Sequence, residues 1–202
     1  MNKAILIPIK PIWCEKIMNR DKLIEVRKNK ALYTATKKLI EEQGYATFFM
    51  YCTKDKNNTL ISYEHHLGDE IVVRYDTTND KHFIEFGALS TLNGKVVAMF
   101  AVRKVDEIKR LNMAYRQYLG EGGFSQLCKD SCLTFEELDK YLGFKNGYAY
   151  HIEDLVIFDK PKELNDFIKW YDILGNNTPT DILPHFRLTK APQNFCYVES
   201  EE

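Results

Sequence analysis

The chain has 202 residues and a mass of 23.7 kDa, with 28 lysines and arginines against 29 aspartates and glutamates. A hydrophobic content of 45% and a charged content of 28% are ordinary for a globular protein, which excludes intrinsic disorder, collagen and coiled-coil arrays. The net charge of −1 argues against a strongly basic nucleic-acid-binding surface over the whole chain.

Neither a targeting segment nor a membrane span is predicted, because the apolar runs are too short for a signal peptide or a bilayer. The five cysteines are scattered and odd in number, which favours reduced thiols in the cytoplasm. Cys128 and Cys132 are four residues apart, so a metal pair stays open beside a role as small buried hydrophobic residues. No nearby Cys or His completes such a site, so we expect no metal and no cofactor.

The chain begins with a predicted strand–helix–strand unit. Residues 4–9 form a short apolar run that is typical of a buried strand. Pro11 is suited to the first turn of the helix that follows, and residues 22–28 then alternate as a strand does.

The next segment alternates between regular structure and polar connections. The spacing of apolar residues predicts a helix over 31–42, and the aromatic run 45–52 predicts a buried strand. Residues 53–68 are polar and predict a loop. Two further strands are expected at 69–75 and 81–86, joined by a turn at 77–80.

The middle of the chain combines a turn signal with a helical region. Asn93 and Gly94 suit the two positive-φ positions of a tight hairpin, which predicts a long central strand at 96–105. Residues 106–147 are predicted to be a helical insertion. A capping box that starts at Thr134 marks the beginning of one of its helices.

The last quarter returns to strands. Residues 148–158 alternate, 161–170 predict a short amphipathic helix, 172–190 look irregular, and 191–198 predict a final strand. Mostly antiparallel strands with inserted helices indicate one α+β domain over the whole chain, with a small closed or half-closed barrel.

Charge is distributed unevenly. Residues 1–40 contain ten Lys or Arg and three acids, a balance of +7, so the remaining residues carry −8. This asymmetry indicates a basic face for phosphate groups and an acidic face for solubility. Two solvated faces of uneven composition are the alternative.

Two segments, residues 9–18 and 22–28, resemble the signature of the ASCH domain, a family of the PUA-like superfamily. Lys22, Glu25 and Arg27 match the Lys-x-x-Glu-x-Arg pattern of its loop. The resemblance implies a PUA-like small mixed or antiparallel β-barrel with inserted and flanking helices. It also implies a cleft around these three residues that binds RNA or a nucleotide.

The chain departs from the family pattern at three positions. Arg20 stands where the family has a loop glycine, and Leu23 stands where a small hydroxyl residue often follows the lysine. Some small ASCH-like proteins are amidohydrolases that use a Lys and a Thr of this loop to remove the acyl group from acetylcytidine. Glu25 lies where that Thr would align, and a carboxylate does not replace a hydroxyl nucleophile.

The residues of the motif suit nucleotide chemistry by themselves. Glu25 and Arg27 lie two apart on a strand and share a face, with Lys22 at its start. A carboxylate accepts hydrogen bonds from the amine and ring N–H of a base, and the two cations bind phosphate or hold the carboxylate charged. A purely structural ion pair is the alternative.

Aromatic side chains provide stacking surfaces for bases, although core packing is the alternative for each of them. The candidates for stacking are Trp13, Tyr148, Tyr150 and Tyr197. His151 is a candidate general base, and Gln193 a candidate for contact with a base edge. The full set of nucleic-acid-binding candidates is Lys10, Trp13, Lys22, Glu25, Arg27, Tyr148, His151, Gln193 and Tyr197.

Three functions remain open at this point. The first is a domain that binds single-stranded RNA or a nucleotide. The second is a hydrolase of the same fold, an amidohydrolase on a modified nucleobase or a ribonuclease, with Lys22 and Glu25 as its catalytic residues. The third is a protein-interaction module that uses the helical region 106–147, for which no motif identifies a partner.

Overall fold

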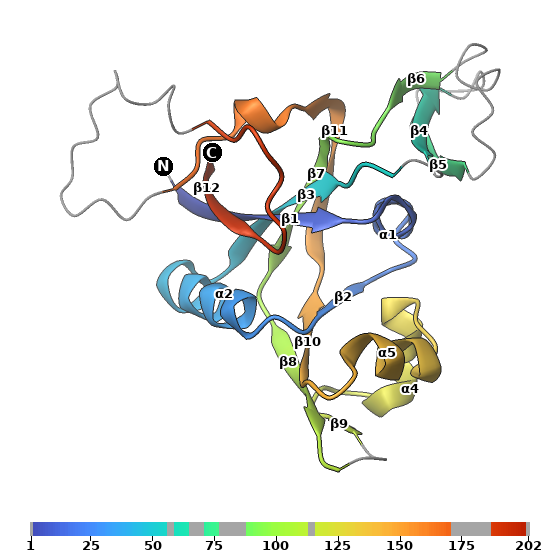
Figure 1. Cartoon of the computed structure of the whole chain (residues 1–202), viewed down its shortest axis with the longest axis vertical. Helices are drawn as coiled ribbons and strands as arrows, with labels where there is room; N and C mark the ends of the chain where they lie inside the picture. The colour runs from blue at the N-terminus through green and yellow to red at the C-terminus, as the bar shows by residue number, and fades with distance from the viewer. Residues whose placement is uncertain are drawn as a thin grey trace.

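The computed structural model describes residues 2–55, 59–64, 71–76, 88–112, 116–170 and 187–200. Within these ranges, four α-helices and three β-sheets form a mixed α+β fold, as predicted (Figure 1). No helix in these ranges is long and apolar enough to cross a membrane.

The largest sheet has five strands in the order β11-β7-β3-β1-β12. Its strands are β1 (Asn2–Ile9), β3 (Ala46–Cys52), β7 (Val96–Val102), β11 (Glu153–Lys162) and β12 (Cys196–Ser200). Strands β1 and β3 are parallel, and the other neighbours are antiparallel. A parallel pair needs a crossover, which is made by α1 (Pro11–Met18), β2 (Ile24–Arg27) and α2 (Lys30–Gln43).

The second sheet is antiparallel and has the order β2-β10-β8-β9. Its further strands are β8 (Val105–Arg110), β9 (Arg116–Tyr118) and β10 (Gly147–His151). Strand β7 continues into β8 after two residues, and β10 continues into β11 after one. Two long bent strands therefore run through both sheets (Figure 1).

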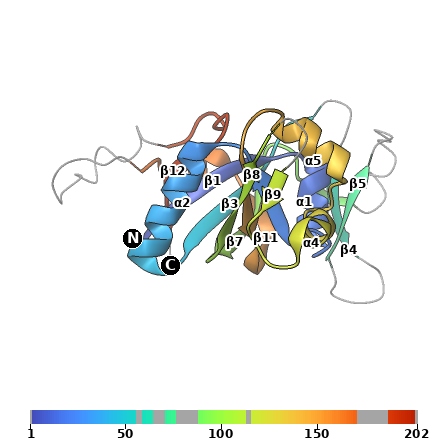
Figure 2. The ribbon, with the colours of Figure 1, turned by 90° about the horizontal axis from the view of Figure 1, so that it is seen from below.

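A third sheet has the order β5-β4-β6, with β4 at Thr59–Glu64, β5 at Ile71–Asp76 and β6 at Ala88–Thr91. Its strands β4 and β5 lie beside α1. Figure 2 shows α1, β4 and β5 at one end of the molecule, together with α4 (Gly123–Ser131) and α5 (Phe135–Leu142), while α2 lies at the other end.

The predicted barrel is not closed. In each of the two larger sheets the first and last described strands are unpaired with each other, so both sheets are open. The long strands bend where they change sheets, and the β7–β11 register shifts between Glu153 and Val156. Asp154 in this stretch has a φ of 47°, which breaks the regular extended backbone.

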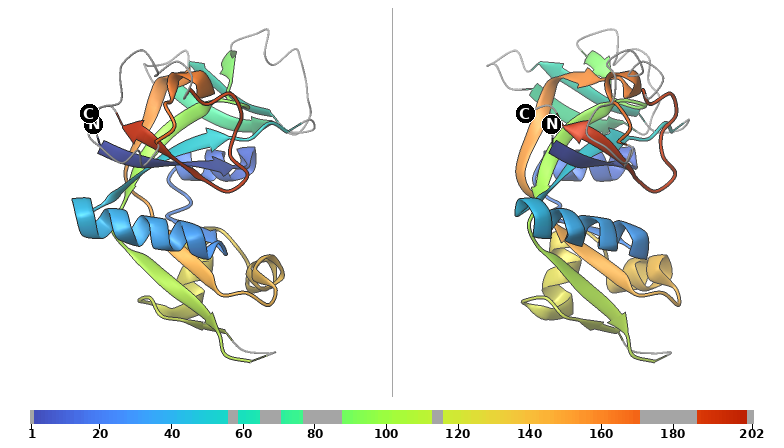
Figure 3. Two further views of the ribbon diagram at one scale, coloured as in Figure 1. Left: turned by 60° about the vertical axis from the view of Figure 1, so that its left-hand side comes forward. Right: turned by 90° about the vertical axis from the view of Figure 1, so that its left-hand side faces the viewer.

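The first two helices begin and end where the sequence predicts. Pro11 occupies the first turn of α1. The Asn29 side chain caps α2, because its Oδ1 accepts a hydrogen bond from the Leu32 N–H at 3.1 Å. Gly44 ends α2 with a φ of 81°, a conformation that favours glycine. Helix α2 lies across the junction of the two larger sheets (Figure 3).

The segment 106–147 is only partly helical. It contains most of β8 and all of β9 before α4 and α5, so the prediction of a helical insertion is wrong for its first third. The capping box is confirmed: Thr134 Oγ1 accepts from the Glu137 N–H at 3.1 Å, and Glu137 Oε2 accepts from the Thr134 N–H at 2.9 Å. The two apolar residues of β8, Val105 and Ile108, are three positions apart, a spacing that resembles an amphipathic helix over so few residues.

The predicted hairpin at Asn93 and Gly94 is also wrong. Strand β6 pairs with β4, whereas β7 pairs with β3 and β11. Gly94 has a φ of 84°, but Asn93 lacks the positive φ that the expected hairpin requires. The Gly94 N–H instead donates to the Cys52 carbonyl at 2.7 Å, which ties this turn to the end of β3.

Three other segments differ from expectation. The predicted strand 96–105 is divided between two sheets, and the predicted loop 53–68 contains β4. The predicted helix 161–170 holds the end of β11 and a 3-10 turn, because its apolar Phe167 packs onto the five-stranded sheet. The predicted strand 69–75 is largely confirmed as β5. Outside the described residues lie the predicted strand 81–86, the turn 77–80 and most of the segment 172–190.

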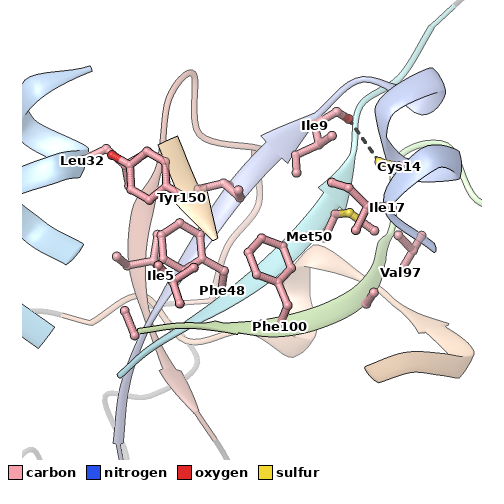
Figure 4. Close-up of a cluster of buried hydrophobic side chains, with 14 of the residues drawn as sticks. Ile5, Ile9, Cys14, Ile17, Leu32, Phe48, Met50, Val97, Phe100 and Tyr150 are labelled. Atoms are coloured by element: carbon pink, nitrogen blue, oxygen red, sulfur yellow. Dashed lines mark hydrogen bonds between the residues drawn. The ribbon is translucent and has the colours of Figure 1, made fainter. Parts of the chain in front are cut away.

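The main hydrophobic core lies between the five-stranded sheet and helices α1 and α2. Phe48, Phe100 and Tyr150 lie at its centre, each about 1% exposed (Figure 4). The ring centroids of Phe48 and Phe100 are 5.5 Å apart, and those of Phe48 and Tyr150 are 5.8 Å apart. Because Tyr150 belongs to β10 and the phenylalanines to β3 and β7, this cluster holds the two larger sheets together.

Removal of the Tyr150 hydroxyl should stabilise the protein. The hydroxyl is buried beside Thr36 without a well-aligned hydrogen bond among the described residues, so Tyr150→Phe should raise the free energy of unfolding by up to about 1 kcal/mol. Burial raises the pKa of Tyr150. The unfolded chain releases this proton near pH 10, about where tyrosine ordinarily titrates, while the folded chain retains it, so wild-type stability falls as pH rises further.

The Tyr150→Phe variant should therefore lose less stability than the wild type between neutral pH and about pH 11. Urea unfolding at both pH values measures this difference. Tyr45→Phe, at a partly exposed position, is the control. An equal alkaline loss in the wild type and in Tyr150→Phe would contradict the prediction.

Candidate functional site

Strand β2 divides its side chains between two environments. Ile24 and Val26 are buried in a cluster that includes residues of α4 and α5. Glu25 and Arg27 project from the opposite face, as strand alternation requires. The strand therefore presents a carboxylate and a guanidinium side by side, as predicted from their spacing.

The turn between α1 and β2 brings Lys22 to this face. The Arg20 N–H donates to the Ile17 carbonyl at 3.0 Å, and the Asp21 N–H donates to the Lys16 carbonyl at 2.9 Å. These two hydrogen bonds make a Schellman motif, in which the residue after the helix cap is left-handed. Arg20 holds that position with a φ of 63°, so the turn keeps a glycine-like conformation without a glycine.

Replacement of Arg20 with glycine should stabilise the protein by about 0.5–1 kcal/mol. A side chain pays a steric cost at positive φ that glycine avoids, and this gain exceeds the extra entropy of glycine in the unfolded chain. Urea unfolding of Arg20→Gly and Arg20→Ala tests this. Because alanine keeps the Cβ, we expect its stability to stay near the wild-type value, and equal stabilisation by both variants would contradict the explanation.

Lys22 is almost completely buried, with 3% of its surface exposed. Its Nζ donates to the Ser131 carbonyl at 2.7 Å, at the end of α4, and lies 3.5 Å from Glu25 Oε2. It also lies 5.1 Å from the centroid of the Trp13 ring. Lys22 therefore joins α1, β2 and α4 through one ammonium group.

Burial lowers the pKa of Lys22, and the neighbouring Glu25 carboxylate partly offsets this effect. The unfolded chain thus binds the lysine proton more tightly than the folded chain does. The resulting cost in stability is present at neutral pH and decreases as pH rises toward about 10.4, the ordinary lysine value.

Glu25 is enclosed between two cations and is 6% exposed. Its Oε1 lies 2.8 Å from Arg27 Nε, an ion pair that lacks hydrogen-bond alignment. Arg27 Nη2 donates to the Pro8 carbonyl at 2.6 Å, which ties β2 to the end of β1. The three charged residues of the motif therefore form one buried cluster with fixed backbone partners.

This cluster lines a cavity of about 570 Å³ between β2, α5 and the junction of β1 with α1. Six of the nine predicted binding residues lie at this cavity: Lys10, Trp13, Lys22, Glu25, Arg27 and Gln193. Lys10 and Gln193 are exposed there, whereas Lys22 and Glu25 form its buried part. Lys10 and Gln193, which are 183 positions apart in the sequence, thus meet at one cavity.

Three predicted residues lie elsewhere. Tyr148 is buried and stacks on Tyr33 with ring centroids 4.3 Å apart. Tyr197 lies beneath Lys3, whose Nζ is 4.0 Å from the ring centroid. His151 lines a separate cavity of about 300 Å³. None of these side chains lines the larger cavity, because β10 and β12 place them on other surfaces.

His151 takes part in a polar cluster of the second sheet. Its Nε2 lies 2.7 Å from Asp106 Oδ2, which also accepts a hydrogen bond from the Tyr118 hydroxyl at 2.9 Å. Burial and the Asp106 carboxylate raise the pKa of Tyr118. The cluster joins β8, β9 and β10 through the side chains of Asp106, Tyr118 and His151.

Residues of α5 and of the segment just before it complete the larger cavity, and sequence analysis did not identify them. They are Leu133 and, on the helix itself, Glu137, Lys140 and Tyr141. The lysine Nζ of Lys28 donates to the Tyr141 carbonyl at 2.9 Å and holds this helix close to β2. The capping box in the sequence correctly placed the start of this helix, but it did not indicate that the helix packs beside β2 and lines the cavity.

In the part of the chain that the structure describes, no group of three or more His, Cys, Asp and Glu residues could hold a metal ion. Cys132 donates its thiol hydrogen to the Asp21 carbonyl at 3.3 Å. Burial raises the pKa of Cys128 and of Cys14. These environments fit small hydrophobic residues better than reactive thiols.

No family model matches the sequence, and no curated protein matches it. Solved structures do match, among them ASCH from Zymomonas mobilis and a point mutant of that protein. Each is 12% identical and gives a TM-score of 0.46, over 95% of this chain and 85% of the other chain. The chain is thus similar in structure to this ASCH protein. The similarity extends along nearly its whole length, at low sequence identity.

Proposed function

We propose that the protein binds single-stranded RNA or a nucleotide in the cavity between β2, α1 and α5. The observation that supports this most is the convergence of the Lys22–Glu25–Arg27 cluster with aromatic and cationic side chains at one cavity. A volume of about 570 Å³ lies within the range of small-molecule sites.

The charges of this cavity favour an anion. Four cations line it, Lys10, Lys22, Arg27 and Lys140, against the two acids Glu25 and Glu137. Lys22 and Arg27 are already paired with Glu25 and with backbone carbonyls. Lys10 and Lys140 are exposed, so they are the cations that contact phosphate.

Two aromatic residues line the cavity, one from α1 and one from α5. Trp13 of α1 is partly buried beside Lys22, and Tyr141 of α5 is 38% exposed. An exposed aromatic face stacks on any base, which favours an unpaired strand or a single nucleotide over a duplex.

Fluorescence anisotropy with short labelled single-stranded RNA tests this function. The double variant Lys10→Ala/Lys140→Ala should weaken binding by roughly tenfold or more at low salt. Two phosphate contacts also predict a slope of about −1.4 for log K against log salt concentration, which the variant should flatten.

The matched control is Lys37→Ala/Lys129→Ala, which removes two exposed lysines that do not line the cavity. This variant should keep most of the affinity and the salt slope. Absence of binding to RNA at low salt, or equal losses in the two double variants, would overturn the proposal.

Hydrolysis of RNA or of a modified nucleobase is the second candidate, and the lowered pKa of Lys22 favours it. A buried lysine beside a carboxylate is the kind of group that serves as a general base or as an electrostatic stabiliser. Incubation with acylated cytidine and with RNA, followed by product analysis, tests this. Turnover no greater than that of Glu25→Gln would exclude it.

A further inference from the structure

We propose that this cavity selects guanine, through the Glu25 carboxylate together with the open backbone edge of β2. The inference rests on the proposed function, since it names the base that the cavity accepts. Three observations carry it: the pairing direction of β2, the position of Val26, and the environment of Glu25.

Strand β2 is the end strand of its sheet and pairs only with β10 among the described strands. The His151 N–H donates to the Lys104 carbonyl at 3.1 Å, and the Ile152 N–H donates to the Leu23 carbonyl at 2.9 Å. Successive residues of an antiparallel strand direct their backbone groups to opposite sides. The backbone groups of the even-numbered residues of β10 therefore make hydrogen bonds with β2, at Glu25 and at the odd-numbered residues on either side of it.

This alternation directs the N–H and C=O of Val26 away from β10, toward the open edge of the sheet. Val26 lines the cavity, although its side chain is buried in the cluster with α4 and α5. The described part of the chain provides no hydrogen-bond partner for either group. The cavity therefore contains one backbone donor and one backbone acceptor that a ligand can satisfy.

Glu25 adds two acceptors beside this edge. Its carboxylate is held on one side by Lys22 at 3.5 Å and on the other by Arg27 at 2.8 Å. An ion-paired carboxylate accepts hydrogen bonds and donates none, and each oxygen has two lone pairs. The carboxylate therefore retains acceptor capacity toward the cavity, and a ligand must offer donors to it.

Guanine matches this pattern better than the other bases do. Its ring N1–H and its exocyclic amine are adjacent donors for a carboxylate, and its O6 accepts from a backbone N–H. Adenine and cytosine place a ring acceptor next to their single amine, and uracil flanks its one N–H with two carbonyls. Each of these three bases would place a lone pair opposite the Glu25 carboxylate, which would leave one acceptor of this buried charged group without a hydrogen-bond donor.

The test uses the full-length protein and labelled pentanucleotides that differ only at the central base: UUGUU, UUAUU, UUCUU, UUUUU and the inosine analogue of the first. We expect UUGUU to bind roughly tenfold or more tightly than the other four. Inosine keeps N1–H and O6 but lacks the amine. Its lower affinity relative to UUGUU therefore measures the contact of the amine with the Glu25 carboxylate.

Equal binding of the five oligonucleotides would overturn guanine selection and leave the proposed function standing. Absence of binding by all five would overturn both. Equal binding of guanosine and inosine, with the other three weaker, would overturn the pairing of the amine with Glu25.

Two glutamates of the same cavity offer a matched pair of variants. Glu25→Gln should reduce the preference for guanosine over inosine to near unity, since an amide presents one donor and one acceptor. Glu137→Gln should leave that preference unchanged, and glutamine preserves the capping box at Thr134. A folded Glu25→Gln protein that keeps the full preference would overturn the assignment, and the wild-type series decides the question if that variant does not fold.

Discussion

Replacement of Glu25 with alanine should lower the free energy of unfolding by about 3–5 kcal/mol. The carboxylate is buried between Lys22 and Arg27, and its removal leaves the Lys22 ammonium buried without its counterion. The hydrogen bond from Lys22 to the Ser131 carbonyl does not neutralise that charge. Urea unfolding at neutral pH measures the loss.

Two further variants separate a buried ion pair from an ordinary surface contact. Glu42→Ala breaks an exposed pair with Lys38 at 3.7 Å and should cost less than about 0.5 kcal/mol. The double variant Lys22→Met/Glu25→Ala removes both charges and should recover at least about 1 kcal/mol relative to Glu25→Ala. Equal losses for Glu25→Ala and Glu42→Ala would contradict the burial of the cluster.

Replacement of Phe48 with alanine should be similarly severe, with a loss of about 3–5 kcal/mol. Phe48 of β3 packs between Phe100 of β7 and Tyr150 of β10, so its removal opens a cavity where three strands meet. The two surrounding rings belong to strands of different sheets, and the backbone hydrogen bonds of those strands restrict how far the rings can move to close the cavity. Thermal and urea unfolding both measure the effect.

Phe144→Ala is the matched control, since it makes the same truncation at a side chain that is 81% exposed. The guanidinium of Arg110 lies 4.7 Å from the Phe144 ring, so a loss of up to about 1 kcal/mol is expected. If Phe48→Ala cost no more than Phe144→Ala, the core would have to lie elsewhere.

The candidate site was largely predictable because its central residues are close in sequence. Lys22, Glu25 and Arg27 lie within one turn and one short strand, where strand alternation alone places the last two on one face. The contribution of α5 was not predictable, since Lys140 and Tyr141 approach β2 through tertiary packing and the Lys28 hydrogen bond. Tyr148 and His151 were predicted at the binding site but lie outside the larger cavity. The related reason is that an alternating strand pattern does not show which other elements pack against each face of the strand.

Local signals with a local cause were confirmed. Pro11 and the Thr134 capping box act within one or two helical turns, so their sequence context suffices to place the starts of α1 and α5. The prediction of a hairpin at Asn93 was wrong because the turn makes a backbone hydrogen bond to the end of β3, and its flanking strands pair with other strands. The prediction of one strand over residues 96–105 was wrong because the chain changes from one sheet to the other after Val102. That change depends on which strands are available for pairing on each side.

The sequence by itself determined the α+β composition, the strand–helix–strand unit at the start, and the grouping of Lys22, Glu25 and Arg27 within a basic segment. The tertiary structure alone decided that the sheets stay open, that this cluster is buried, and that α5 and Gln193 complete its cavity. The physical reason is range. Backbone dihedral preferences and alternation act between near neighbours, whereas burial and strand pairing depend on contacts between segments far apart in the chain.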